Sequence, residues 1–128
     1  MENTLRYSDA DLQVFETLLI GKLNKAYEQV ESLQVQLIEM EESIEDSSGI
    51  HYMNDGNYSE QIEFLNGMVH RQRKHISDLE NAIMRVKNKT YGRCVVTGQL
   101  IDKKRLMAVP TTTKSMMAKT QLAPTQRR

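Results

Sequence analysis

The chain has 128 residues, of which 39% are hydrophobic and 27% charged, with no tryptophan. This composition suits long helices that bury a narrow apolar seam better than a thick globular core, and the length indicates one domain. One cysteine excludes an intrachain disulfide and any zinc site built from cysteines alone. No apolar run approaches the ~18 residues of a membrane span, and the N-terminus lacks a signal-peptide pattern, so we expect a cytoplasmic protein.

Charge is segregated along the chain although the formal net charge is zero. Between Ala26 and His70 there are ten acidic residues and no Lys or Arg, whereas fourteen basic and three acidic residues lie from Arg71 to the end. For any single side chain, a solvated face explains the charge. The segregation as a whole indicates a function that uses opposite charges at separate places.

The N-terminal part of the chain predicts one long helix after a flexible lead-in of residues 1–7. Ser8 is a good N-cap, and the acids Asp9 and Asp11 favour the positive end of the helix dipole. Ser47-Ser48-Gly49 should end the helix, because these residues interrupt the apolar pattern. That pattern is a heptad seam, formed by Leu23, Ala26, Val30, Leu33, Leu37, Met40 and Ile44.

A second seam predicts a second long helix, beginning near Ser59 after a connection at residues 47–58. The connection contains Asn54-Asp55-Gly56-Asn57, a strong turn signal. The seam residues are Ile62, Leu65, Val69, Gln72, Ile76, Leu79, Ile83 and Val86, of which only Gln72 is polar. Two such helices predict an antiparallel coiled-coil hairpin over residues 8–88. A monomer is favoured because the connection is short, and a dimer through the same seams is the alternative.

Residues 91–110, YGRCVVTGQLIDKKRLMAVP, predict a compact knuckle. Gly92 and Gly98 can supply backbone conformations closed to most other residues, and Cys94 lies between them. We expect the knuckle to be held by packing of its apolar residues, namely Val95, Val96, Leu100, Ile101, Leu106, Met107 and Val109. A short final helix from Lys114 to about Leu122, capped by Thr111-Thr112-Thr113, should complete a head at residues 89–122, followed by a basic tail at 123–128.

The knuckle resembles the signature of the TraR/DksA family, Y-G-x-C-x-x-C-G-x-x-I-x-x-x-R-L-x-A-x-P followed by C-x-x-C. The matching residues are Tyr91, Gly92, Cys94, Gly98, Ile101, Arg105, Leu106, Ala108 and Pro110. Thr97, Ser115 and Ala118 stand where the family carries three further zinc cysteines. The resemblance therefore implies a mostly α protein with a degenerate zinc-finger-like head, in which Cys94 is the only remaining ligand-type cysteine. We expect it to fold without metal.

Members of this bacterial family regulate transcription by binding RNA polymerase and inserting the acidic hairpin tip into its secondary channel. The resemblance implies the same function here, without sequence-specific DNA binding and with Asp55, Asn54 and Asp46 at the tip. The family's tip motif, D-x-x-D-x-A, is not reproduced.

Basic residues near the helix base and the knuckle are the candidates for docking on polymerase or for binding an effector. They are Arg71, Arg73, Lys74, Lys103, Lys104 and Arg105. The family often acts with ppGpp in the stringent response. This chain has Val109 where the best-known members have a basic residue, so ppGpp is not our expected cofactor.

Catalysis has little support in the sequence. His70 and His75 are five residues apart, which is not the i, i+4 spacing of a helical metal pair, and no histidine is close to Cys94 in sequence. Two alternatives to the regulator stay open: a Gre-type transcript cleavage factor, and a structural coiled-coil adaptor or homodimer.

Overall fold

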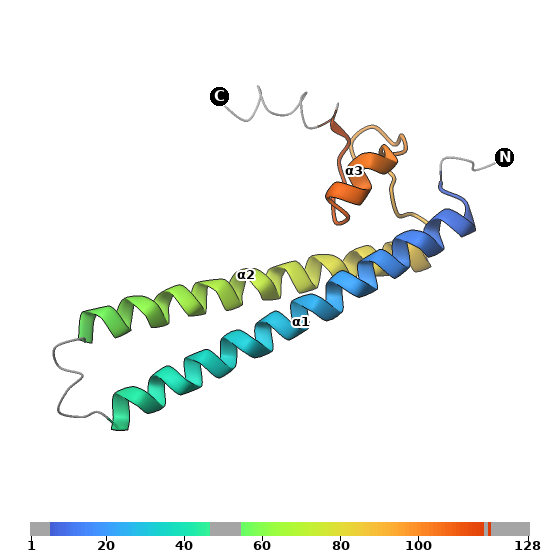
Figure 1. The fold of residues 1–128 in the computed structure, drawn as a ribbon. Helices are drawn as coiled ribbons and strands as arrows, with labels where there is room; N and C mark the ends of the chain where they lie inside the picture. The colour runs from blue at the N-terminus through green and yellow to red at the C-terminus, as the bar shows by residue number, and fades with distance from the viewer. Residues whose placement is uncertain (1–5, 47–54, 117, 119–128) are drawn as a thin grey trace, which may run out of the picture. The chain divides into compact units, whose positions relative to one another are not determined.

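The computed structural model describes residues 6–46, 55–116 and 118. The helices are α1 (Asp9–Asp46), α2 (Asp55–Lys87) and α3 (Lys103–Ala108), and α1 and α2 run antiparallel (Figure 1). The predicted mostly α fold with a helical hairpin is confirmed. None of the described helices has the length and apolarity needed to span a membrane.

The ends of the two long helices follow local chemistry. At the start of α1, the Asp11 N–H donates to Ser8 Oγ at 3.1 Å, which is the predicted N-cap. α2 begins at Asp55, earlier than the expected start near Ser59. Asn and Asp are favoured at helix N-termini as well as in turns, so the turn signal at residues 54–57 was ambiguous. The rest of the connection, residues 47–54, lies outside the described residues.

The chain divides into two compact units, of which unit 2 is residues Leu23–Ser77. Its core consists of Leu33, Leu65 and Val69, and three further apolar side chains pack against them, namely Leu37, Met40 and Met68. These residues come from both predicted seams and their immediate neighbours, so within this unit the seams of α1 and α2 bury each other. Gln72 Oε1 is buried here without a hydrogen-bond partner.

Unit 1 comprises residues Met1–Lys22 and Asp78–Arg128, and its core is aromatic. The Phe15 ring centroid lies 5.5 Å from that of Tyr7 and 5.2 Å from that of Tyr91. Tyr7 Oη donates to the Ile101 carbonyl, and Tyr91 Oη donates to the Pro110 carbonyl at 2.7 Å. Tyr7, which the sequence placed in the lead-in, is therefore buried against the knuckle.

α2 ends in a left-handed turn at Lys89, whose φ is 65°. The Lys89 N–H donates to the Val86 carbonyl at 3.0 Å, and the Thr90 N–H donates to the Arg85 carbonyl at 2.9 Å. This pair of hydrogen bonds is a Schellman motif, in which the left-handed position is usually glycine. The motif turns the chain out of α2 and into the knuckle.

The knuckle is a tight ribbon rather than a sheet. Gly92 and Gly98 have φ values of 85° and 75°, as their turn roles require. One isolated antiparallel bridge joins Arg93 to Leu100, and the Cys94 N–H donates to the Gln99 carbonyl at 2.8 Å.

The expected apolar packing of the knuckle is wrong for four of its residues. Ile101 and Leu106 are fully buried, but four others are 43–67% exposed, namely Val95, Val96, Met107 and Val109. Val95 and Val96 lie in the turn that leads to Gly98, where a side chain has little protein around it. Tyr91, Phe15 and Tyr7 from neighbouring segments fill the core in their place.

The cap of the final helix also differs from the expectation. Lys114 and Ser115 are not helical, whereas Met116 and Ala118 are. The Ala118 N–H donates to Ser115 Oγ at 3.1 Å, so Ser115, and not the preceding threonines, occupies the N-cap position. Thr112 instead holds the loop, because its Oγ1 accepts from the Lys114 N–H at 3.3 Å. Residues 119–128 lie outside the described residues.

Candidate functional site

The acidic residues predicted for the hairpin tip lie at the ends of the two long helices. Asp46 is the last residue of α1 and Asp55 is the first residue of α2. Asn54 lies outside the described residues, and the side chains of Asp46 and Asp55 are not described. The assignment of these three residues to a polymerase-facing tip stays a prediction.

Unit 2 also contains an apolar groove that the sequence analysis did not predict. It has a volume of about 310 Å³ and is lined by Gln36, Glu39, Met40, Ser43, Tyr58 and Leu65. Phe64, which directly precedes the lining residue Leu65 on α2, is 63% exposed. The sequence did contain a signal for an exposed apolar surface here, because Phe64 is an aromatic residue outside the heptad seam.

The six basic candidates belong to two separate groups. Arg71, Arg73 and Lys74 are exposed on the part of α2 that lies in unit 2. Lys103, Lys104 and Arg105 form the first turn of α3 in unit 1. The Asp102 side chain caps that turn by accepting from the Lys104 N–H at 3.2 Å.

The three basic residues of α3 differ in what they contact. Arg105 Nε donates to the Lys114 carbonyl at 2.8 Å, and its terminal nitrogens contact Thr112 Oγ1 and Met116 Sδ at 3.2 and 3.1 Å. Lys103 Nζ lies 3.3 Å from an Asp11 carboxylate oxygen and 5.8 Å from the centre of the Tyr7 ring. Arg105 therefore ties the loop after α3 to the helix, and the exposed Lys104 is the member most accessible to a partner.

Cys94 lies where the four positions of the family's zinc site converge. Its Sγ accepts hydrogen bonds from the N–H groups of Thr97 and Ser115, both at 3.4 Å, and the Ala118 N–H is bonded to Ser115 Oγ. One thiolate with two hydroxyl groups and a methyl group does not supply the ligands of a structural zinc site. Among the described residues, no three His, Cys, Asp or Glu side chains are grouped to hold a metal ion.

The hydrogen bonds around Cys94 stabilise its thiolate. Burial raises the pKa of the thiol, but hydrogen bonds from the Thr97 side chain and from the backbone N–H groups of Ser115, Thr97 and Val96 outweigh it, and lower the pKa of Cys94 to about 6. The side chain is only 1% exposed. The hydrogen bonds to Sγ join Cys94 to the turn at Thr97 and to the loop at Ser115.

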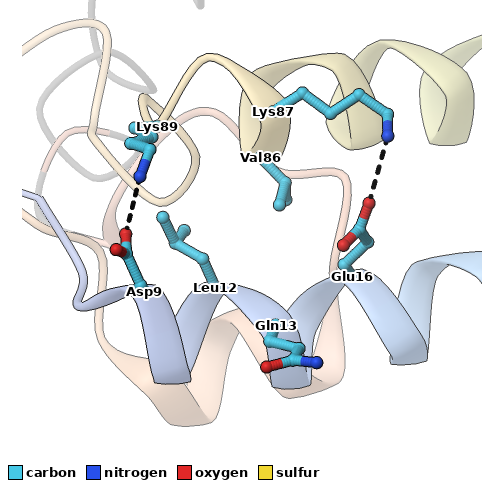
Figure 2. A pocket seen from close by; sticks show the side chains of 7 residues that line it. All are labelled: Asp9, Leu12, Gln13, Glu16, Val86, Lys87 and Lys89. Atoms are coloured by element: carbon cyan, nitrogen blue, oxygen red, sulfur yellow. Dashed lines mark hydrogen bonds and ion pairs between the residues drawn. The ribbon is translucent and has the colours of Figure 1, made fainter.

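A second groove, with a volume of about 370 Å³, lies in unit 1 between the start of α1 and the end of α2. Figure 2 shows that two ion pairs cross it, Lys89–Asp9 at 2.9 Å and Lys87–Glu16 at 3.4 Å. Leu12, Gln13 and Val86 line the space between them. Because each lysine faces a carboxylate, a phosphorylated ligand would have to displace an acidic side chain to bind there.

Comparisons with known proteins find a match to part of the sequence. The chain is 48% identical over 48 residues to the RNA polymerase-binding transcription factor DksA of two strains of Caulobacter vibrioides, NA1000 / CB15N and ATCC 19089 / CIP 103742 / CB 15. The matched segment spans 38% of this chain and about a third (34%) of each relative. No family model matches the chain.

The fold also matches a solved structure, that of transcription factor DksA2 from Pseudomonas aeruginosa. The TM-score is 0.84 at 24% sequence identity, over 93% of this chain and 88% of the other. At this identity the likeness concerns the fold.

Proposed function

We propose, from the premise that the chain is DksA-like in local sequence and in fold, that it is a transcription regulator that binds RNA polymerase. The observation that carries the proposal is the local match to proteins named for polymerase binding, in a chain whose fold agrees with that of DksA2. A regulator of this kind needs no catalytic group of its own.

The finer part of the proposal is that the hairpin end of unit 2 enters the secondary channel of the polymerase. Its support is the segment between Ala26 and His70, which contains ten acidic residues and no Lys or Arg. Such a surface is attracted to a positively lined channel, and its carboxylates are oxygen ligands for Mg²⁺ or compete electrostatically near it. Within this mechanism Asp55 acts at the polymerase active site, and Asn54 and Asp46 are the other candidate residues of the tip.

The basic residues of each unit would make separate contacts with polymerase. Arg71, Arg73, Lys74, Lys103 and Lys104 are exposed and would meet acidic surface around the channel entrance. Arg105 would contribute indirectly, by holding the loop after α3. In its simplest form this regulator is a monomer located in the cytoplasm. It would act without ppGpp, since both lysines of the groove in Figure 2 already face carboxylates.

The test is a binding and transcription assay with core and holo RNA polymerase, comparing the unmodified chain with Asp55→Asn. We expect polymerase binding that weakens at high salt, because the contacts are electrostatic. Asp55→Asn should bind with nearly the same affinity but lose most of the effect on promoter-specific initiation, because it keeps the size of the side chain and removes its charge.

Matched controls separate the parts of this proposal. Glu28→Asn removes an exposed acid of α1 that is distant in sequence from the proposed tip and should leave regulation unchanged. Lack of polymerase binding at low salt would overturn the function as a whole. Binding with full regulation by Asp55→Asn would overturn the tip mechanism alone, and cleavage of the transcript in stalled complexes would identify a Gre-type factor instead.

A further inference from the structure

The groove in unit 2 lies on one defined side of the coiled coil. On α1, the lining residues Gln36 and Ser43 each precede a seam position by one residue. On α2, Gln61 and Met68 precede seam positions in the same way. In an antiparallel pair of helices, these flanking positions lie on the same side of the interface.

Phe64 belongs to this side as well. It is three residues after Gln61 and four before Met68, which are the spacings of neighbours on one helix face. Met68 packs against the core cluster, whereas Phe64 remains 63% exposed. We call the groove lining together with Phe64 the groove face.

The charge around the groove face selects the chemistry of its occupant. Glu39 lines the groove and is exposed, and the exposed Glu60 lies four residues before Phe64 on α2. No Lys or Arg occurs between Ala26 and His70, so the groove face has no cation of its own from this stretch. An exposed aromatic beside an apolar groove bordered by acids fits a positively charged protein segment that inserts an apolar side chain.

We propose that the groove face is a docking surface for a basic, apolar segment of RNA polymerase, with Phe64 as its anchor. This inference rests on the proposed function and adds a lateral contact to the one made by the tip. An aromatic side chain loses little conformational entropy when it is buried and contributes a large apolar area, which is why such residues dominate many interfaces. Glu39 would pair with a Lys or Arg of the segment at the edge of the groove.

The experiment compares Phe64→Ser with Ile38→Ser in equilibrium binding to core RNA polymerase. Ile38 is 54% exposed in the same unit, but it directly follows the seam position Leu37 and so lies on the other side of the coiled coil. Both side chains are largely in solvent, so neither variant should lose its fold, which thermal unfolding checks. We expect Phe64→Ser to weaken binding by roughly tenfold to thirtyfold, and Ile38→Ser by less than about twofold.

A second pair of variants tests the charge. Glu39→Gln and Glu31→Gln each remove one exposed acid of α1, but Glu31 directly follows the seam position Val30 and lies away from the groove. Glu39→Gln should weaken binding severalfold at low salt and have little effect at high salt, because exposed ion pairs are screened. Glu31→Gln should show the smaller effect at low salt.

The outcomes distinguish the inference from the function on which it rests. If the unmodified chain does not bind polymerase, both are overturned. If it binds, and Phe64→Ser and Ile38→Ser bind as well as it does, the groove face is not a docking surface and the proposed function stands. If the free chain sediments as a dimer that Phe64→Ser dissociates, the occupant is a second copy of this chain and the inference is overturned.

Discussion

The two units of this chain are stabilised in different ways. In unit 2, a narrow seam packs around Leu33, Leu65 and Val69, each still 7–9% exposed. In unit 1, Tyr91, Ile101 and Leu106 are completely buried, and hydrogen bonds from Tyr7 and Tyr91 reach carbonyl groups distant in sequence. The difference indicates that the head, which keeps one cysteine, depends on close packing, whereas the seam tolerates small defects.

From the contrast between the two units, we expect the largest loss of stability for a substitution at Gly92. A methyl group there would lie 2.6 Å from Tyr7 Cε2, and the residue has a φ of +85°. The ring cannot easily move, because it contacts Phe15 and its hydroxyl is bonded to Ile101. We expect Gly92→Ala to lower the free energy of unfolding by about 2–4 kcal/mol, from backbone strain and overpacking together.

Gly98→Ala is the matched control for this prediction. Gly98 has a similar φ of +75°, but a methyl group on it would meet no atom within 4 Å apart from its own chain neighbours. The substitution should therefore cost only the backbone strain, about 1 kcal/mol. Denaturant unfolding measures both variants, and equal losses would contradict the view that the head is held by close packing.

In unit 2, we expect a substitution at Gln72 to have a smaller effect on stability, and one of opposite sign. Its Oε1 is buried without a hydrogen-bond partner, in a seam that is otherwise apolar. Gln72→Leu should raise the free energy of unfolding by about 1 kcal/mol, because it removes an unsatisfied acceptor and adds apolar contact. The measurement is the urea midpoint at unchanged slope.

Sedimentation must accompany the Gln72 measurement, because a polar residue in a seam can also set register and oligomeric state. Asn66→Leu, at an exposed position of the same helix, controls for the gain in helix propensity. A Gln72→Leu variant that is less stable than the unmodified chain, or no more stable than Asn66→Leu, would show that Gln72 is satisfied in solution.

Sequence alone was sufficient for features set by local pattern. The heptad seams predicted α1, α2 and their mutual packing, and Ser8 predicted the start of α1. The positive φ values of Gly92 and Gly98 also follow from their place in a turn motif. Each helix, cap and turn depends on residues within a few positions of one another, and the mutual packing follows from two such local patterns.

Features that depend on distant residues could not be predicted in this way. Tyr7 contacts Ile101 across 94 positions, and no periodicity connects them. α3 has only six residues, too few for a helical pattern to emerge. Val95 and Val96 are apolar but lie in an exposed turn. At the candidate site, the acidic segment was visible from composition, whereas the groove beside Phe64 required both helices to be in place.

A further prediction concerns Cys94 and depends on pH. The thiol has a pKa of about 6 in the folded protein, against 9.0 for an unperturbed cysteine. A group whose pKa is depressed by folding contributes stability above its unfolded pKa, and this stability is lost as pH falls through the folded pKa. Stability from Cys94 should therefore rise between pH 6 and pH 9 and be absent below pH 6.

Cys94→Ser isolates this contribution, because a serine hydroxyl accepts the same hydrogen bonds from Thr97 and Ser115 but does not ionise in this range. Urea unfolding at about pH 5.5, 7 and 8.5 should show a difference between the two proteins that grows with pH, while the other titrating groups cancel. Parallel pH profiles would mean that the sulfur stays protonated in the folded protein. In that case the head would be held by packing around a neutral thiol, and the contrast with unit 2 would rest on the aromatic core alone.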